Sequence, residues 1–295
     1  MALVTVASFN TRWGRDLRGR PLDVAAVVRR LDADVVALQE MWRPDGEESP
    51  ATSIGSLLGY RVFELPLARG FLVASASPRP LPPGTRRPAP GYLDPAGRSG
   101  TDGGRDESIV EGDVTMVPGS GRRLRRGHSR LLLGRPLPVN EAPPQRGAWG
   151  LAILTRLPVR REAQVDLGQL RLDRARRGAL VLEMDLEGRP FIMVGTHLSH
   201  LTHGSLLQLR GLRRSLPGTD QAAALAGDMN LWGPVVGLFL PGWRRAVLGR
   251  TWPAHRPHSQ IDHVFVTPMV SVLTGEVLGD VGSDHRPVRA ELRLA

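Results

Sequence analysis

The stretch Ala222-Ala-Ala-Leu-Ala-Gly-Asp-Met-Asn230 decides how the rest of the chain is interpreted. Its apolar run is too short for most helices and is typical of a buried strand. Asp228 and Asn230 leave the end of this strand, and residues two apart on an extended chain point to the same side. The pair can therefore face one point in space, where a carboxylate accepts a proton or binds a cation and an amide donates a hydrogen bond. An Asx turn is the alternative interpretation of Gly-Asp-x-Asn.

The composition is that of a globular protein with a positive charge. The 295 residues, 41% of them hydrophobic, suffice for one large α/β or two-sheet domain, or for two smaller ones. All 39 basic residues are arginine, and the formal net charge is +10. This charge can attract a polyanion such as nucleic acid or an anionic lipid surface. The same charge is also compatible with an ordinary solvated surface, so composition leaves both interpretations open.

The chain contains no cysteine, which excludes disulfides and thiolate metal sites. Any metal ion must then be held by oxygen or imidazole ligands. The residues after Met1 show neither the basic segment nor the long apolar segment of a signal peptide, and no apolar run reaches the length of a membrane span. We therefore expect a soluble cytoplasmic protein, with a monomer as the default oligomeric state.

Apolar patterns predict more strands than helices. Helices are expected at 22–33, 51–59, 205–215 and 235–240, and strands at 3–9, 34–39, 60–65, 69–76, 149–155, 163–167, 179–186, 191–196, 222–228, 244–248, 261–267, 270–278 and 287–294. Few strands are followed by a long crossover helix, which favours mostly antiparallel sheets with helices outside over a purely parallel sheet. The predicted class is α/β (α+β), in a single domain over residues 1–295.

A segment of different composition interrupts this pattern at about 77–147. It contains 12 Pro and 12 Gly. A Pro and Gly fraction of this size exceeds the roughly 25–30% that marks low-complexity sequence without a repeat. We expect an irregular, exposed and flexible insertion within the domain.

Polar residues that can bind a cation or move a proton close six of the apolar runs. They are Asn10, Glu40, His197, Asp228 with Asn230, Asp262 with His263, and Asp284 with His285. Each alone is compatible with a cap or a turn. Because strand ends at one edge of a layered β fold gather in one place, the joint arrangement indicates a functional site.

Seven short motifs span nearly the whole chain outside the insertion. They are Ser8-Phe-Asn-Thr-Arg12, Val36-Ala-Leu-Gln-Glu40, Trp149-Gly-Leu-Ala-Ile-Leu-Thr155, Gly195-Thr-His-Leu198, Gly227-Asp-Met-Asn230, Ile261-Asp-His-Val264 and Ser283-Asp-His-Arg-Pro-Val288. In this order they resemble the endonuclease/exonuclease/phosphatase superfamily, which has the deoxyribonuclease-I-like fold. The resemblance implies a four-layer α/β sandwich, with two packed and mostly antiparallel sheets flanked by helices. It also implies metal-dependent cleavage of a phosphoester by water.

The resemblance further implies a divalent ion, Mg²⁺ with Mn²⁺ as an alternative. Glu40 is the implied main metal ligand, with Asn10 beside the ion and Asp284 as a further carboxylate on the metal side. The chemistry agrees, because Mg²⁺ prefers one or two carboxylates and keeps several waters. Such an ion neutralises developing charge and orients the phosphate.

Five residues are implied to act on the phosphate and the water. His285 is the histidine on the phosphate, with Asp262 as its orienting carboxylate. Asp228 positions or deprotonates the water, and Asn230 and His197 donate to the phosphoryl oxygens. A carboxylate behind an imidazole fixes its tautomer and favours the imidazolium form. Whether Asp228 or His285 is the base stays open on the sequence.

Two other interpretations concern residues near these motifs. His263 alternates to the opposite side from Asp262, which favours a structural role. Arg176 or Arg177 could reach a phosphate, although the arginine-rich surroundings weaken this signal.

The sequence predicts a phosphodiesterase, with nucleic acid, either DNA or RNA, slightly favoured as the substrate because of the arginine excess. One alternative is a lipid or small-molecule phosphoesterase, similar to a sphingomyelinase or a phosphoinositide phosphatase. Another is a non-catalytic, polyanion-binding member of the fold. The intact set of acids, amides and imidazoles argues against the latter.

Overall fold

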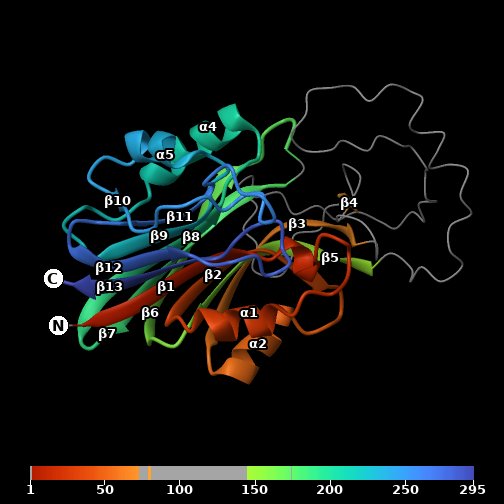
Figure 1. The fold of residues 1–295 in the computed structure, drawn as a ribbon, viewed down its shortest axis with the longest axis horizontal. Helices are drawn as coiled ribbons and strands as arrows, with labels where there is room; N and C mark the ends of the chain where they lie inside the picture. The colour runs from red at the N-terminus through yellow and green to blue at the C-terminus, as the bar shows by residue number, and fades with distance from the viewer. Residues whose placement is uncertain (1, 73–78, 81–144, 174) are drawn as a thin grey trace, which may run out of the picture.

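The computed structural model describes residues 2–72, 79–80, 145–173 and 175–295. Two sheets pack face to face in the described part of the chain, and helices cover both outer faces (Figure 1). Both sheets are mostly antiparallel. The predicted fold class, a four-layer α/β sandwich, is therefore confirmed.

The first sheet has seven strands in the order β12-β13-β1-β2-β5-β3-β4. Their bounds are β1 Leu3–Asn10, β2 Val35–Pro44, β3 Arg61–Leu72, β4 Arg79–Pro80, β5 Gln145–Thr155, β12 Val270–Val277 and β13 Val288–Leu294. Neighbours are antiparallel except β1 and β2. The two chain ends lie side by side (Figure 1), where the N–H of Leu294 donates to the carbonyl of Ala2 at 3.0 Å. Asn10 lies at the other end of β1, away from the termini.

The second sheet has six strands in the order β10-β11-β9-β8-β7-β6. Their bounds are β6 Val159–Gly168, β7 Arg177–Leu186, β8 Arg189–His197, β9 Ala223–Asp228, β10 Arg244–Arg245 and β11 Asp262–Val266. Only β8 and β9 are parallel. The apolar stretch that ends at Asp228 is therefore a central and fully buried strand, β9, as expected.

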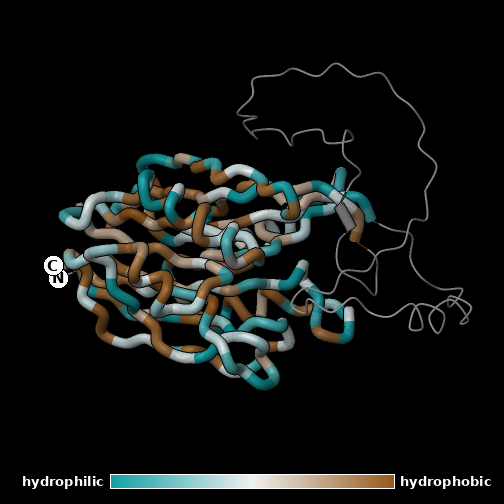
Figure 2. Tube along the Cα trace, turned by 90° about the horizontal axis from the view of Figure 1, so that it is seen from above, coloured by the Kyte–Doolittle hydropathy of each residue, from teal (hydrophilic) through white to brown (hydrophobic). Residues whose placement is uncertain are grey.

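Helices supply the outer layers. They are α1 Val24–Leu31, α2 Pro50–Leu58, α4 Thr202–Arg213 and α5 Gly233–Phe239, with a short 3₁₀ helix at Arg12–Gly14. The main core lies between the sheets, where Ile153 of the first sheet and Leu180 and Met193 of the second belong to one buried cluster. α1 and α2 pack on the outer face of the first sheet, and α4 and α5 on that of the second. Figure 2 shows apolar stretches alternating with polar ones along these layers, as two-faced elements require.

Local sequence signals explain where the first two helices begin and end. The side chain of Asp23 accepts the N–H of Ala26 and caps α1. Ser49 caps α2, and Pro50 occupies its first turn. Gly59 ends α2 with a left-handed φ of 75°, as predicted for a helix ending there.

Some strands differ from their predicted lengths because pairing continues where the apolar pattern does not. β2 continues through a bulge to Pro44, paired with β5. β3 likewise continues past a bulge near Pro66 to Leu72, so the strand expected at 69–76 is described only as the end of β3. The strand expected at 244–248 shortens to the two residues of β10.

Most of the predicted insertion at 77–147 lies outside the described residues. Residues 79–80 form β4, and 145–147 already belong to β5. Among the described helices, none has the length and apolar character needed to cross a membrane.

Candidate active site

The ends of neighbouring strands bring the predicted polar residues together. In the second sheet, Asp228 at the end of β9 is paired with His197 on β8 and with Asp262 on β11. Asn10 ends β1 of the first sheet, and its Nδ2 donates to Oδ2 of Asp228 at 3.0 Å. This bond joins strand ends of the two sheets, so the site lies between the sheets at the end away from the termini.

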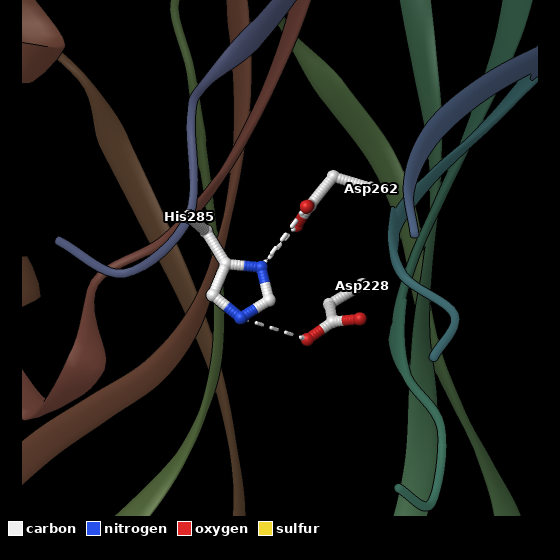
Figure 3. A group of neighbouring side chains, drawn as sticks. All are labelled: Asp228, Asp262 and His285. Atoms are coloured by element: carbon white, nitrogen blue, oxygen red, sulfur yellow. Dashed lines mark hydrogen bonds and ion pairs between the residues drawn. The ribbon is translucent and has the colours of Figure 1, made fainter. Parts of the chain in front are cut away.

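His285 lies between two buried carboxylates (Figure 3). Its Nδ1 is 3.0 Å from Oδ1 and 2.9 Å from Oδ2 of Asp262, and its Nε2 is 3.8 Å from Oδ2 of Asp228. Burial alone would lower the pKa of His285, but Asp262 and Asp228 outweigh it and raise the pKa well above its ordinary value. In the imidazolium form, Nδ1–H is donated to Asp262 and Nε2–H faces Asp228.

Asp228 is a buried carboxylate that accepts a hydrogen bond on each oxygen. Asn10 reaches Oδ2, and the backbone N–H of Asn230 donates to Oδ1 at 2.9 Å. Nε2 of His197 lies 3.5 Å from Oδ2. Burial raises the pKa of Asp228 to about 7, against an opposing effect of His285. A carboxyl group with this pKa can take up or release a proton near neutral pH.

Gly227, just before Asp228, is required by the close packing of two neighbouring strands. A Cβ at this position would lie 1.9 Å from the carbonyl oxygen of Thr196 on the neighbouring parallel strand, and its φ is 153°. Only glycine fits this close approach. The bond from the Asn230 N–H to Asp228 is an Asx turn, so the turn and the site occur at the same residues.

Glu40 lies in a strained part of β2. Its φ is 55°, within the bulge that interrupts the pairing of β2 with β5. The hydroxyl of Thr11 contacts the carbonyl oxygens of Gln39 and Glu40 at 3.0 and 3.1 Å and helps to fix this conformation. The bulge directs the Glu40 carboxylate to 4.0 Å from Nε2 of His197. Burial, and then the neighbouring Asp284 carboxylate, raise the pKa of Glu40 to about 7.

Asn10 at the end of β1 and Asp284 in the last loop both contact the turn at Arg12. Oδ2 of Asp284 is 3.7 Å from Nε of Arg12, and the Asp284 side chain is partly exposed. Asn10 Oδ1 accepts the backbone N–H of Arg12 at 3.1 Å, so the amide links that turn to Asp228. Ser283 donates its hydroxyl to the carbonyl of Asn10 at 2.8 Å and holds the loop in place.

The two predicted hydrogen-bond donors to the phosphoryl oxygens, Asn230 and His197, have different surroundings. Asn230 donates through Nδ2 to the carbonyl of Leu198 at 3.0 Å, which leaves the second amide hydrogen for another acceptor. Its φ is 50°, so the backbone is left-handed here too. Burial, with a contribution from the Arg177 charge, lowers the pKa of His197 well below its ordinary value. This imidazole is therefore neutral near pH 7.

His263 has the structural environment expected for it. It is fully buried, and its Nε2 is 2.9 Å from the carbonyl oxygen of Leu231. Burial lowers the pKa of His263 to about 4. Its ring packs near Phe265 rather than toward the cluster at the strand ends.

Several residues that support the site carry little signal in the sequence. Thr11 and Ser283 are adjacent to predicted residues, and their small hydroxyl side chains were the only signal. Asp173 forms a buried ion pair with Arg177 beside His197, but its residue type alone does not distinguish it from other acidic residues of the chain. Arg177 was noted only weakly, because the sequence surrounds it with other arginines.

One group of side chains in the described residues has the geometry to hold a divalent metal ion. Asp228, Asp262 and His285 each offer a ligand atom, and these atoms all lie within 4.8 Å of one another. All three side chains are buried. The predicted metal ligands Asn10, Glu40 and Asp284 do not belong to this group, although the Asp284 charge acts on Glu40 beside it.

Solved structures of similar fold cover essentially the whole chain. An endonuclease/exonuclease/phosphatase from Beutenbergia cavernae is 21% identical over 100% of this chain and 72% of that one, with a TM-score of 0.65. The mannosyl-6-phosphatase of Bacteroides thetaiotaomicron is 15% identical over 99% and 100%, with a TM-score of 0.57. The catalytic domain of human nocturnin with a bound sulfate anion is 14% identical over 100% and 94%, with a TM-score of 0.56. These similarities establish the fold alone.

Sequence comparison gives the family. No curated protein matches the chain at a significant level. A family model described as the Endonuclease/Exonuclease/phosphatase family matches residues 7–285, which include every predicted site residue. The chain therefore belongs to the endonuclease/exonuclease/phosphatase family.

Proposed function

We propose that the protein is a metal-dependent phosphodiesterase that cleaves nucleic acid by attack of water on phosphorus. As a member of its family it is a phosphoesterase. The main support for this proposal is a buried row of three side chains, in which the His285 imidazole lies between the Asp262 and Asp228 carboxylates. It combines an orienting group, a cation and a carboxylate with a pKa near 7, as hydrolysis at phosphorus requires.

We propose that the divalent ion, Mg²⁺ or Mn²⁺, binds to the oxygen ligands beside this row of three side chains. Glu40 and Asp284 are like-charged neighbours, so a cation between them would offset their repulsion. Mg²⁺ prefers carboxylate oxygens and waters, whereas imidazole suits transition metals. Asn10 adjoins this pair through its bond to Arg12. When bound, the ion neutralises charge on the phosphoryl group.

Asp228 is the base in this proposal. His285 holds its proton at neutral pH because two carboxylates stabilise the imidazolium, so it acts as a cation toward the phosphoryl group. Asp228 has a pKa of about 7 and can accept the proton of an attacking water. The bond from Asn10 keeps its oxygen in place for this transfer.

His197 and Asn230 are the proposed donors to the phosphoryl oxygens. Neutral His197 carries one N–H, which we assign to Nε2 because this atom lies near the carboxylates of Asp228 and Glu40. Asn230 retains one amide hydrogen after its bond to Leu198. Donors held in this way are aimed before the reaction and need no rearrangement.

Nucleic acid is the proposed substrate because the protein carries a formal net charge of +10 and all of its basic residues are arginine. Arginine pairs with phosphate through two parallel hydrogen bonds, and such contacts dominate the affinity for polyanions. Binding should therefore weaken steeply as salt concentration rises.

A substrate panel tests the proposal. We expect Mg²⁺ or Mn²⁺ to support hydrolysis of bis-p-nitrophenyl phosphate and of DNA or RNA, and EDTA to return the rate to background. Phosphoinositide, sphingomyelin and a sugar 6-phosphate complete the panel. Cleavage of one of these without cleavage of nucleic acid would reassign the substrate, and no cleavage of any compound would refute the hydrolase.

Asp262→Asn tests the orienting role of this carboxylate. The amide can donate a hydrogen bond to Nδ1 and so reverse the tautomer of His285, and it removes the charge that raises the His285 pKa. We expect kcat to fall by about 10²–10⁴-fold and the alkaline limb of the pH–rate profile to move to lower pH. Asp220→Asn, at an exposed turn, is the control and should leave both unchanged. An unshifted alkaline limb would contradict the role.

A further inference from the structure

The segment 231–243, which contains α5, is apolar along its whole length although it lies in an outer layer of the molecule. It reads Leu-Trp-Gly-Pro-Val-Val-Gly-Leu-Phe-Leu-Pro-Gly-Trp, with no charged residue and no polar group except the two indoles. One side of α5 packs on the second sheet, where Val236 and Leu240 belong to the buried cluster. A helix that is apolar on all sides is normally buried on all sides. Packing within the fold therefore accounts for the inner face of α5 and not for its outward face.

The outward face of α5 exposes large apolar side chains. Leu238 is 81% exposed, and Trp232, immediately before the helix, is 63% exposed. Pro234 is also exposed, and Val235 and Phe239 are half-buried. A single exposed leucine is ordinary on a protein surface, but large apolar side chains gathered on one helix face mark an interaction site.

α4 lies beside α5 in the same outer layer and borders this face with arginines (Figure 1). The Arg210 guanidinium lies over the Phe239 ring, 5.1 Å from its centroid, and joins the exposed sides of the two helices. Leu207 precedes Arg210 by three residues, so it lies on the same side of α4, and it is 54% exposed. Arg213 and Arg214 are exposed at the end of α4.

Acidic residues are scarce around this face. The sequence of α4 contains none, and neither does the segment 229–261, which includes α5. The turn between α4 and β9 has one, the exposed Asp220. Apolar side chains bordered by arginines, with an indole at each end of the apolar segment, are typical of helices that lie in the interface of a membrane. The arginines would then meet anionic lipid headgroups.

Two other occupants fit this face less well. A second copy of the chain, joined through the same face, would bring two arginine-bordered surfaces together with only Asp220 of each copy to offset the repulsion. Nucleic acid would pair with the arginines, but Leu207 and Leu238 could form no hydrogen bond to phosphate or sugar. An anionic bilayer accommodates both the apolar and the positively charged side chains.

We propose that the outward face of α5, together with Leu207 and the arginines of α4, is a docking surface for anionic phospholipid bilayers. The association is peripheral, because the seven residues of α5 are far too few to cross a bilayer. Leu238 and Trp232 enter the boundary between headgroups and acyl chains, and the arginines stay among the headgroups. The inference goes beyond the proposed function and does not depend on it, because the docking surface contains no residue of the active site.

Vesicle cosedimentation of the full chain in EDTA tests the proposal. We expect binding to vesicles of phosphatidylcholine mixed with phosphatidylglycerol, and much weaker binding to phosphatidylcholine alone. Leu238→Ser should weaken binding to the mixed vesicles by about tenfold, because a leucine leaves the apolar layer. Arg213→Gln/Arg214→Gln should weaken it by about 25-fold at low salt, about fivefold for each arginine. High salt should reduce the effect of the arginine variant and preserve that of Leu238→Ser.

The helices on the opposite side of the molecule provide matched controls. Leu57 of α2 is 64% exposed, and Arg29 and Arg30 are exposed in the last turn of α1. Leu57→Ser and Arg29→Gln/Arg30→Gln make the same chemical changes and should stay within about twofold of the wild type, because charges far from the bilayer are screened. Hydrolysis of bis-p-nitrophenyl phosphate with Mn²⁺ should be unchanged in the variants of both layers.

Failure of the wild type to bind the mixed vesicles, or equal losses in the two sets of variants, would overturn the inference and leave the proposed function intact. The face would belong to nucleic acid if Arg213→Gln/Arg214→Gln weakened oligonucleotide binding while Leu238→Ser left vesicle binding unchanged. It would belong to a second copy if Leu238→Ser turned a dimer into a monomer in sedimentation velocity and again left vesicle binding unchanged. Vesicle binding with the expected losses, in a protein that hydrolyses no phosphoester, would support the docking surface and refute the proposed function alone.

Discussion

Asp228→Asn is expected to lower kcat by about 10³–10⁴-fold on any phosphodiester that the wild type cleaves. The carboxylate is buried, its pKa of about 7 suits proton transfer at neutral pH, and a carboxamide cannot accept the proton of a water. Asn10 donates to the same Asp228 oxygen that faces His285 and His197, and so holds it in position. The substrate KM should change by much less than kcat, because the role is in the reaction step.

A second Asx turn in the chain provides the control for this variant. Asp280 accepts the N–H of Gly282 at 2.8 Å, just as Asp228 accepts that of Asn230 at 2.9 Å, but Asp280 is exposed. Asp280→Asn makes the same chemical change to the same kind of turn and should retain wild-type kcat. Single-turnover measurements separate chemistry from product release. If Asp228→Asn kept more than about a tenth of the wild-type rate constant for chemistry, the base would have to be sought elsewhere.

The sequence could place the site because its residues lie next to apolar runs, and strand ends meet in layered folds. Asn10, His197 and Asp228 do end their strands, whereas Asp262 begins β11 and Asp284 and His285 precede β13, so for these three the prediction that they close a strand was wrong. Asp228 illustrates this, since its strand was predicted and its pairing with β8 and β11 brings His197 and Asp262 to it. The pairing of Asp262 with His285, 23 residues apart, came only from the resemblance to a family. Strand order is set by contacts between distant segments, which local patterns do not encode.

Other features of the site depend on backbone geometry that no pattern revealed. Glu40 was expected at the end of a strand, but β2 continues past it and the bulge turns its side chain into the site. The same limit applies to Asn10, whose amide bonds Asp228 on one side and the Arg12 turn on the other. The sequence could not predict the ion pair of Asp173 and Arg177. Many charged residues lie near them in the chain, and only their burial distinguishes these two.

Glu40→Gln is expected to abolish tight metal binding and, without metal, to stabilise the fold at alkaline pH. Loss of the proposed carboxylate ligand should raise the Mn²⁺ dissociation constant by about 100-fold or more. This is a larger effect than the loss of a residue that only hydrogen-bonds to a metal ligand. The pKa of Glu40 rises from 4.5 to about 7 on folding. The protonated Glu40 side chain therefore contributes favourably to the stability of the fold below about pH 4.5, and this contribution is lost as the pH rises through about 7.

At pH 8 the ionised Glu40 carboxylate opposes folding of the metal-free protein, whereas glutamine does not. The pKa difference corresponds to about 3 kcal/mol, and water reaches the 20% of the side chain that is exposed, so we expect a gain of about 1–2 kcal/mol. Unfolding monitored in EDTA at pH 4 and pH 8 should show the gain only at pH 8, and Mg²⁺ should then stabilise the wild type but not the variant. Glu187→Gln is the matched control, because Glu187 has a similar left-handed φ of 52° at an exposed turn. Equal stability of wild type and Glu40→Gln at pH 8, with unchanged Mn²⁺ affinity, would remove Glu40 from the metal site and leave its strained conformation without a function.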